Sequence, residues 1–556
     1  MFSSTNCHNW RHRPPPHRLR LMPSPPMLMP SPAARPLACL AGAIVVYGAL
    51  LACLPALAQE TSDKQRCLGE IATSADKRIE ACSALIGKSG TPKDDLPDLY
   101  VGRGDARQEK HQYDAAIADY GLALKADAKN LEALTHRGLA YAAKGDRDKA
   151  LADFDRAIDI NPKDAASYNN RGSLLRDRGA ADRALADFDK AIQIDPGFAP
   201  AHNNRGLTYF DKKDYARAIA AFDEAIRKSA TFAQAFANRG NAYDESSDQK
   251  RAMSDYAEAI RLDPDDALAY VGRGIAFRRQ GDDDKALADF ERAIKAEPSN
   301  VPAREQRGLL LYRKGDYIRA ILDFSEVIKG DPKRASAYNN RGNAHDEKGD
   351  RGRAIADYTQ AIRLDPKYAA AYFNRGTALR RRGDLEKAIA DFDRAIALEP
   401  KNAAFFNNRG NAFAEQSNHD RAIADFDQAL KIDPDYFQAL NNRGNAWLEK
   451  KNYDRAIADY TKASNLSPET ALPLFNRASA LHFAGRDKDA LADINKSIQL
   501  DGKKAPAFST RGLIYEKLGD KDKAIADFHK AVALEPNLKE PADGLIRLGV
   551  GARAKR

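Results

Sequence analysis

Apolar and small residues follow a period of 34 along most of this chain and form two stripes in each period. We number each period from 1 to 34, with its recurrent Arg at position 7. The first stripe has a bulky residue at most copies of position 4, Gly at 8 and usually a large residue at 11. The second has Ala at 20, an aromatic at 24 and Ala at 27. Spacings of three and four residues place each stripe on one face of a helix, so each period predicts two helices.

Turn and cap residues separate the two stripes. Position 15 is Gly in eight periods, and position 16 is Asp or Asn in ten. Gly commonly ends a helix and Asp or Asn commonly begins one. Pro at position 32 in ten periods marks the end of the second helix. We therefore expect a helical hairpin that turns at positions 15 and 16.

Counting outward from that turn predicts which residues meet in the hairpin. Position 11 faces 20, position 8 faces 24, and position 4 faces 27. Each level then combines a large side chain with a small one, which fills the space between helices without voids. The recurrent Gly at position 8 is thus expected to receive the aromatic ring of position 24.

Thirteen such repeats occupy residues 97–538 without a break. Their bounds are 97–130, 131–164, 165–198, 199–232, 233–266, 267–300, 301–334, 335–368, 369–402, 403–436, 437–470, 471–504 and 505–538. Residues 59–96 contain a stretch like a second helix and read as an N-terminal half-repeat, and residues 539–556 read as a capping helix with a basic tail. A repeat of this kind buries its apolar face against its neighbours, so the predicted fold is an all-α solenoid.

The full pattern resembles the tetratricopeptide repeat, in the subtype with Asn-Arg-Gly at positions 6–8. Asn170-Arg171-Gly172 and Asn408-Arg409-Gly410 show that triplet. The resemblance implies antiparallel helix pairs stacked into a right-handed superhelix, whose concave groove is lined by the first helices. It also implies a scaffold that binds other proteins.

The recurrent Arg has a predicted partner at position 23, which is Asp in twelve repeats. Positions 7 and 23 lie at the same level of the hairpin, so we expect structural pairs such as Arg171 with Asp187 and Arg341 with Asp357. The alternative is a row of free arginines that binds an acidic partner.

Asparagines at position 6 are the candidate peptide-binding residues. They are Asn170, Asn204, Asn238, Asn340, Asn374, Asn408, Asn442 and Asn476. A primary amide both donates and accepts hydrogen bonds, so a row of amides can bind the backbone of an extended polypeptide whatever its side chains. In the alternative interpretation these amides are solvated or cap local backbone.

Charges of both signs alternate along the first helices. Arg278, Arg279, Arg380 and Arg381 complete the candidate groove, and acidic pairs such as Asp244-Glu245 lie between them. A mixed-charge polypeptide suits this pattern, whereas a phosphate backbone needs one sign throughout, so we do not expect a nucleic-acid partner. Repeats five, eight and eleven share Arg-Gly-Asn-Ala and a Tyr at position 24, which indicates duplication in blocks of three repeats.

Residues 1–58 have the pattern of an export signal. Five arginines and no acidic residue occur there, an uncharged stretch covers residues 37–54, and Ala56-Leu57-Ala58 is a cleavage pattern. These arginines contribute much of the formal charge of +9. We expect an exported protein of bacterial type in the periplasm or outside the cytoplasm. The alternatives are an uncleaved inner-membrane anchor at 37–58, which would be the chain's only membrane contact, and lipidation at Cys53.

Cys67 and Cys82 are the only cysteines after the predicted signal, and an even pair fits one disulfide in an oxidising compartment. The alternative is two small buried apolar residues. No phosphate-binding loop and no His/Cys cluster with metal-ligand spacing occurs in the sequence, so we expect no catalytic residues, no metal and no cofactor.

The predicted function is a non-catalytic scaffold that holds an extended segment of another protein, and such a chain can also self-associate. The alternatives are a cell-envelope assembly factor that acts through its convex face or its ends, or a subunit that binds glycan chains.

Overall fold

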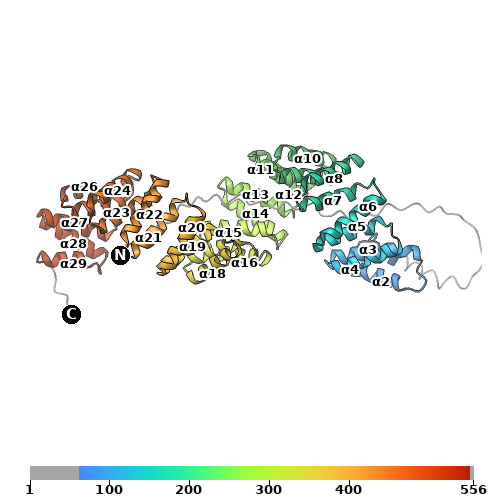
Figure 1. The fold of residues 1–556 in the computed structure, drawn as a ribbon, viewed down its shortest axis with the longest axis horizontal. Coiled ribbons are helices and arrows are strands. Elements are labelled where there is room, and N and C mark those ends of the chain that lie inside the picture. The colour runs from blue at the N-terminus through green and yellow to red at the C-terminus, as the bar shows by residue number, and fades with distance from the viewer. Residues whose placement is uncertain (1–61, 551–556) are drawn as a thin grey trace, which may run out of the picture. The chain divides into compact units, whose positions relative to one another are not determined.

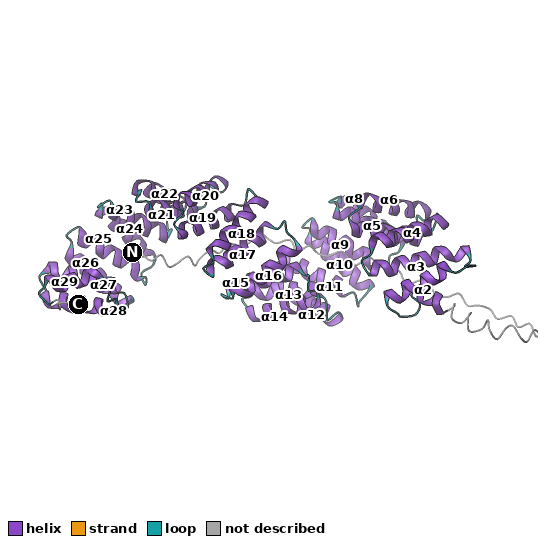
Figure 2. Ribbon diagram, turned by 90° about the horizontal axis from the view of Figure 1, so that it is seen from below, coloured by secondary structure: helices purple, strands orange, loops and turns teal. Residues whose placement is uncertain are grey.

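The computed structural model describes residues 62–550, and all its regular elements there are helices (Figures 1 and 2). The predicted signal, the alternative anchor, Cys53 and the basic tail from residue 551 lie outside the described residues. The chain divides into two compact units, Met1–Ala303 and Arg304–Arg556. None of the helices described is both long and apolar enough to span a bilayer.

Each repeat contributes two helices, which confirms the predicted all-α fold of paired helices. The first unit contains α2 (Ala75–Gly87), η1 (Lys93–Asp95), α3 (Leu96–Glu109), α4 (Tyr113–Ala126), α5 (Leu131–Lys144), α6 (Arg147–Ile160), α7 (Ala165–Asp177), α8 (Ala181–Ile194), α9 (Ala199–Asp211), α10 (Tyr215–Lys228), α11 (Ala233–Glu245), α12 (Gln249–Leu262), α13 (Ala267–Arg279) and α14 (Asp283–Ala296). The boundary between units falls within α15 (Val301–Arg313).

The second unit continues the same alternation. It contains α16 (Tyr317–Gly330), α17 (Ala335–Glu347), α18 (Arg351–Leu364), α19 (Ala369–Arg382), α20 (Leu385–Leu398), α21 (Ala403–Glu415), α22 (His419–Ile432), α23 (Phe437–Glu449), α24 (Tyr453–Leu466), α25 (Ala471–Phe483), α26 (Asp487–Leu500), α27 (Ala505–Leu518), α28 (Lys521–Leu534) and α29 (Lys539–Arg547). Within each unit a first helix contacts its own second helix, and first helices of neighbouring repeats also touch, as α7 and α9 do.

The residue at position 15, in the hairpin turn, has a left-handed backbone conformation in all thirteen repeats. Gly occupies eight of these positions, and the other five are His111, Lys213, Ser247, Ser417 and Lys451. Left-handed backbone is unfavourable for residues with a Cβ atom, which explains the preference for Gly. The next residue often caps the second helix, as where the Asp350 carboxylate accepts the Arg353 backbone N–H at 3.2 Å.

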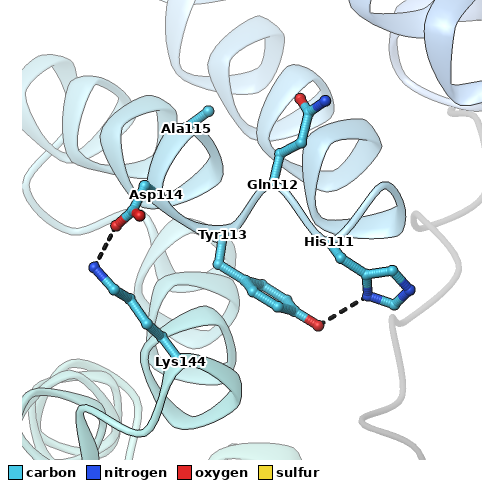
Figure 3. A pocket seen from close by; sticks show the side chains of 6 residues that line it. All are labelled: His111, Gln112, Tyr113, Asp114, Ala115 and Lys144. Atoms are coloured by element: carbon cyan, nitrogen blue, oxygen red, sulfur yellow. Dashed lines mark hydrogen bonds and ion pairs between the residues drawn. The ribbon is translucent and has the colours of Figure 1, made fainter.

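The first of these turns borders a cavity of about 340 Å³. Figure 3 shows the Tyr113 hydroxyl beside His111 Nδ1, at 2.9 Å, and the Lys144 ammonium paired with the Asp114 carboxylate. None of these residues was among the predicted site residues. The cavity lies at the hairpin turn, away from the first-helix positions that carry the candidate asparagines.

The residues at positions 8 and 24 pack against each other as closely as the sequence predicts. A Cβ atom added to Gly342 would lie 2.7 Å from Cε1 of Tyr358, and the other glycines at position 8 are equally close to their rings. One repeat departs from Gly, and it holds Ala478 opposite Ile494 instead of an aromatic. The exception at position 8 and the exception at position 24 therefore occur in the same repeat, because the narrower Ile494 side chain leaves room for the methyl group of Ala478.

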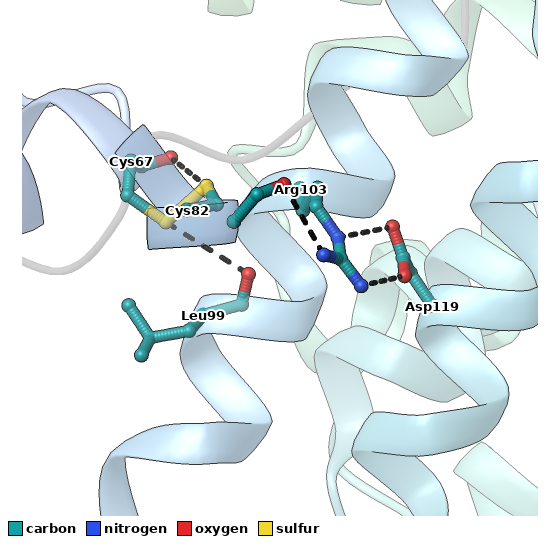
Figure 4. The surroundings of a disulfide bond; sticks show 6 residues. Cys67, Cys82, Leu99, Arg103 and Asp119 are labelled. Carbon is teal, nitrogen blue, oxygen red and sulfur yellow. Dashed lines mark hydrogen bonds and ion pairs between the residues drawn. A yellow bond between two sulfur atoms is a disulfide. The ribbon is translucent and has the colours of Figure 1, made fainter. Parts of the chain in front are cut away.

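The array is capped by α2 at one end and by α29 at the other. Cys67 and Cys82 are fully buried, form a disulfide, and lie against Leu99 of the first repeat (Figure 4). At the C-terminal end, Gly544 and Leu545 of α29 cover Phe528, as a further first helix would. The caps thus complete the apolar contacts that terminal repeats would otherwise leave open.

Candidate binding surface on the first helices

The recurrent arginines form fork-shaped ion pairs with the Asp at position 23. Arg171 donates from Nε and Nη2 to the two carboxylate oxygens of Asp187 at 2.8 and 2.7 Å, and Arg341 donates to Asp357 at the same distances. The same pair forms in twelve repeats. Hydrogen bonds to Asp187 raise the pKa of Arg171 above its ordinary value, although burial opposes this. The guanidinium therefore remains charged and fixed.

Many of these arginines also reach back to the preceding repeat. Nη1 of Arg171 donates to Asp155 at 2.7 Å, and Nη1 of Arg341 donates to the Ser325 hydroxyl at 3.1 Å. Arg205 has Ala instead of Asp at position 23, and it donates to Asp189 of the preceding repeat at 3.0 Å. These contacts favour a structural role, because they consume the donors that an acidic partner would need. Sequence reasoning missed this second contact, which joins position 7 to position 25 of the repeat before.

The asparagines of position 6 connect neighbouring repeats. Asn204 donates to Asn169 at 2.9 Å, and Asn374 donates to Asn339 at 3.0 Å. Asn238 and Asn442 make the same bond to Asn203 and Asn407, both at 3.0 Å. These amides thus form hydrogen bonds within the protein.

The exposure of the position-6 asparagines differs along the chain. Asn204 and Asn238 are only 2% and 0% exposed, and Asn408 and Asn476 are also buried. The Asn408 amide donates to the Ala404 carbonyl of its own helix at 2.9 Å. The half-buried members are Asn170, Asn340, Asn374 and Asn442. Of the eight candidates, these four keep part of their surface accessible.

Asparagines at position 9 explain the period of three repeats. The hydroxyl groups of Tyr358 and Tyr460 donate to the amide oxygens of Asn343 and Asn445 at 2.9 and 2.7 Å. Repeat five makes the same bond between Tyr256 and Asn241, at 2.8 Å. Within repeats five, eight and eleven, the Tyr at position 24 and the Asn at position 9 therefore satisfy each other inside the hairpin.

Polar side chains at position 9 form a continuous row in the second unit. We call this row the amide–hydroxyl stripe, and it consists of Asn343, Thr377, Asn411, Asn445 and Ser479. All five are half-buried, and they come from the five consecutive first helices α17, α19, α21, α23 and α25. The position-6 amide of Asn374 bonds to this stripe at Asn343, at 3.0 Å. The stripe is the most regular partly accessible polar feature of the first helices in the residues described.

The alternating charges at positions 12 and 13 are paired between repeats. Arg381 donates to Asp346 at 2.6 Å, Arg380 donates to Glu415, and Arg279 donates to Asp244. Arg278 lies half-buried next to Arg279 on α13. Burial raises the pKa of Asp244, although Arg279 opposes this. Most charged side chains at positions 12 and 13 are therefore paired within the protein. The exposed surface of these helices still carries both positive and negative side chains.

One cluster of ionisable residues was not predicted from the sequence. The Asp105 carboxylate lies 2.7 Å from Nδ1 of His136 and accepts the Tyr120 hydroxyl at 2.8 Å, with Glu132 nearby. The search for metal-ligand spacing missed it because its members come from two repeats. One ligand atom from each of Asp105, Glu132 and His136 lies within 4.8 Å of the others.

Sequence comparison identifies the repeat. The tetratricopeptide repeat pattern matches residues 101–165, 137–197, 169–233, 237–301, 271–335, 305–350, 339–403 and 407–471, and a second form of it matches residues 505–538. No curated protein matches the chain.

Several solved structures are similar in fold. The APC/C hetero-tetramer Cut9–Hcn1 is 16% identical over 81% of this chain and 96% of that chain, with a TM-score of 0.41. Yeast Tom70 is 17% identical over 83% of this chain and 96% of that chain, with a TM-score of 0.35. A tetratricopeptide repeat protein of Parabacteroides merdae is 21% identical over 45% of this chain and 98% of that chain, with a TM-score of 0.37. With its repeat pattern matched over most of its length, the chain belongs to the tetratricopeptide repeat family.

Proposed function

We propose that this protein is a non-catalytic scaffold that holds an extended polypeptide segment along the first helices of repeats eight to twelve. Family membership supports the general function, because tetratricopeptide repeats serve protein–protein interaction. The observation that carries the specific proposal is the amide–hydroxyl stripe, which offers one partly exposed polar group from each of five consecutive first helices. Such groups can satisfy successive peptide units without selecting particular side chains.

The stripe differs from the buried asparagines in what it can bind. Asn204 and Asn238 are closed off by contacts with the preceding repeat, so they stabilise the stack. Stripe residues are half-buried and hence accessible from one side. The exposed Arg381 and Glu347 border the stripe and favour a segment of mixed charge.

Site-specific photo-crosslinking in the native host tests the proposal. A photoreactive residue at Asn411 should form a crosslink to a partner, and one at the exposed Lys387 of a second helix should not. The triple variant Asn343→Ala, Asn374→Ala and Asn445→Ala removes two stripe amides and the amide that bonds to the stripe, so it should abolish that crosslink. A matched triple variant of exposed second-helix residues, Arg363→Ala, Lys387→Ala and Lys431→Ala, should retain it. Melting curves must accompany both variants, because Asn374 also bridges repeats.

A second candidate is an assembly factor of the cell envelope that acts through the second helices or the ends. The observation that favours it is a pair of apolar side chains on α16, Ile318 and Leu322, which are 61% and 62% exposed. Other repeats have mostly charged residues at the first of these positions and mostly Ala at the second. The double variant Ile318→Asp and Leu322→Lys should abolish partner capture only if this candidate is right. Loss of capture in that variant, with capture retained in the asparagine triple variant, would overturn binding on the first helices.

Export to the periplasm is part of the proposal. Residues 1–58 support export because basic residues are followed there by an uncharged stretch and then by a cleavage pattern. The disulfide between Cys67 and Cys82 supports it as well. Sequencing the N-terminus of the protein from its native host should give Gln59 as the first residue. Retention of residues 37–58 would indicate a membrane anchor instead.

A further inference from the structure

Three helices of the first unit bring an imidazole and carboxylates together. Asp105 of α3 lies 2.7 Å from Nδ1 of His136 in α5, and the Tyr120 hydroxyl of α4 donates to the same Asp105 oxygen at 2.8 Å. Glu132 lies one turn before His136 on α5. One ligand atom from each of Asp105, Glu132 and His136 lies within 4.8 Å of the others. His136 is only 5% exposed, whereas Glu132 lies at the surface.

The repeat register shows that this cluster replaces a neutral contact found elsewhere. His136 occupies position 6 and Asp105 occupies position 9 of the preceding repeat. In the second unit the same two positions hold Asn374 and Asn343, whose amides bond at 3.0 Å. An amide pair therefore suffices to join neighbouring repeats at this level. The ionisable pair at the first boundary adds chemistry that packing does not require.

The charge around the cluster is predominantly negative. Glu132 interacts electrostatically with His136, Asp105 and Asp98. Asp98 also interacts with Lys64. Two carboxylates with a single imidazole carry excess negative charge in a partly desolvated place. A divalent cation would offset that charge.

We propose that Asp105, Glu132 and His136 bind one divalent transition-metal ion, such as Zn²⁺, across the boundary between the first two repeats. Imidazole nitrogen with carboxylate oxygen suits zinc and its neighbours, whereas calcium and magnesium prefer oxygen alone. Three protein ligands leave a fourth position of a tetrahedral site for water or for a side chain of a partner. The Tyr120 hydroxyl holds the Asp105 carboxylate in place, as hydrogen bonds to metal ligands commonly do.

The geometry requires only a small adjustment to accept the ion. Zinc–ligand distances of about 2.0–2.2 Å set neighbouring ligand atoms roughly 3.3–3.6 Å apart in a tetrahedron. His136 and Asp105 would separate by several tenths of an ångström as the ion replaces the hydrogen between them. Glu132 closes the site by rotating its exposed side chain. The bound ion would then tie α3 to α5 beside the disulfide-bonded cap.

Calorimetric titration of the full chain with Zn²⁺ tests this inference. The protein is prepared without a histidine tag and is first treated with a chelator. We expect one Zn²⁺ per chain, and the single variants His136→Asn and Asp105→Asn should each bind at least about tenfold more weakly. His136→Asn restores the amide that other repeats have at position 6, so it should remain folded. The matched control is His482→Asn, which removes a histidine paired with the Asp487 carboxylate far from the cluster in sequence, and should leave binding unchanged.

A surface variant separates ligand loss from misfolding. Glu132→Gln alters only the exposed member of the cluster, and its far-ultraviolet circular dichroism should match that of the parent chain. It should also bind Zn²⁺ at least about tenfold more weakly. Absence of stoichiometric Zn²⁺ binding in the parent chain would overturn the proposal. Equal Zn²⁺ affinity of the parent, His136→Asn and Glu132→Gln would overturn it as well.

Discussion

At the scale of single residues, two backbone positions determine how each hairpin closes. Position 8 must be small because the aromatic ring of position 24 lies against its Cα, and position 15 must accept a left-handed backbone. Neither requirement involves a ligand. The recurrent glycines are therefore explained by the fold alone.

Replacing Gly342 should destabilise the second unit. A Cβ atom there would lie 2.7 Å from the Tyr358 ring and 3.2 Å from the Ala354 carbonyl oxygen, so Gly342→Ala should cost about 1–3 kcal/mol and Gly342→Leu more. Urea unfolding followed by circular dichroism measures the change. The matched control is Gly352→Ala on α18, where an added Cβ atom would meet only Asp350 Oδ1, at 3.8 Å, outside its own helix backbone, and where helix propensity favours Ala. Equal effects of the two Ala substitutions would contradict the packing argument.

Replacing Lys213 by Gly should stabilise the first unit. Lys213 has a φ of 60° at the hairpin turn, where eight other repeats have Gly. Relief of the left-handed strain exceeds the entropy that Gly adds to the unfolded chain, so we expect a gain of about 0.5–1 kcal/mol. The neighbouring Lys212 has a φ of −77°, and Lys212→Gly should instead destabilise. A rise in the melting temperature for Lys213→Gly and a fall for Lys212→Gly would support this account.

At the scale of the helix, twelve of the thirteen hairpins are joined internally by an Arg–Asp ion pair, and repeats five, eight and eleven also have a tyrosine–asparagine hydrogen bond. Tyr358 illustrates the second contact: its ring fills the space over Gly342 and its hydroxyl reaches Asn343. Burial raises the pKa of Tyr358 well above its ordinary value, and Asp346 adds to this effect. The hairpin therefore depends on a neutral phenol.

Alkaline pH should weaken these hairpins. Above about pH 10 the unfolded chain loses the tyrosine proton while the folded chain keeps it, so rising pH favours unfolding. The contribution of neutral Tyr358 to the free energy of unfolding is fully present below about pH 10. Between that pH and the pKa of Tyr358 in the folded chain, this contribution declines by about 1.4 kcal/mol per pH unit. Tyr358→Phe should lose some stability at pH 7, where the Asn343 bond is missing, and should show a shallower decline between pH 10 and 12. Parallel curves of urea midpoint against pH for parent and variant would contradict this.

The helices could be predicted from the sequence because their signals are local. The hydrogen-bond partners of many polar residues could not be predicted, because they lie in other repeats. Most repeats contain their own stripes, cap and stop, so α18 or α22 follows from its own 14 residues and their flanks. The pairing of Arg171 with Asp187 followed from counting within one hairpin. The bond from Asn204 to Asn169 spans 35 residues and depends on how two repeats stack, which spacing within one repeat does not show. The same reason hid the Asp105–His136 cluster.

At the scale of the whole molecule, each repeat contacts mainly its sequence neighbours. Stability in such an array is approximately a sum of repeat and interface contributions, so a local change should have local effects. The caps are the places where this expectation is easiest to test, because each has a neighbour on one side only.

Removing the disulfide should loosen only the N-terminal end. Cys67 and Cys82 are 15 residues apart, and a loop of this size predicts a loss of about 3 kcal/mol when both become Ser. Hydrogen–deuterium exchange should rise in α2 and α3 and stay unchanged in α23 to α28. A uniform rise along the chain would show that the repeats unfold as one cooperative unit. Cys7, Cys39 and Cys53 precede the predicted mature N-terminus, so cleavage there would remove them and leave Cys67 and Cys82 as the remaining pair.

The double contact of the recurrent arginine bears on how such a gene changes length. Arg171 bonds forward to Asp187 and backward to Asp155, and each partner lies 16 residues away. A deletion or insertion of whole 34-residue segments leaves both distances intact at the new junction, whichever repeats are joined. Unequal recombination can therefore add or remove blocks of coding sequence and keep the Arg–Asp pair inside twelve of the thirteen repeats, whereas Arg205 depends on the acceptor in the repeat before it. The Asn–Tyr combination of repeats five, eight and eleven fits duplication in blocks of three repeats, and array length in related genes should vary in steps of whole repeats.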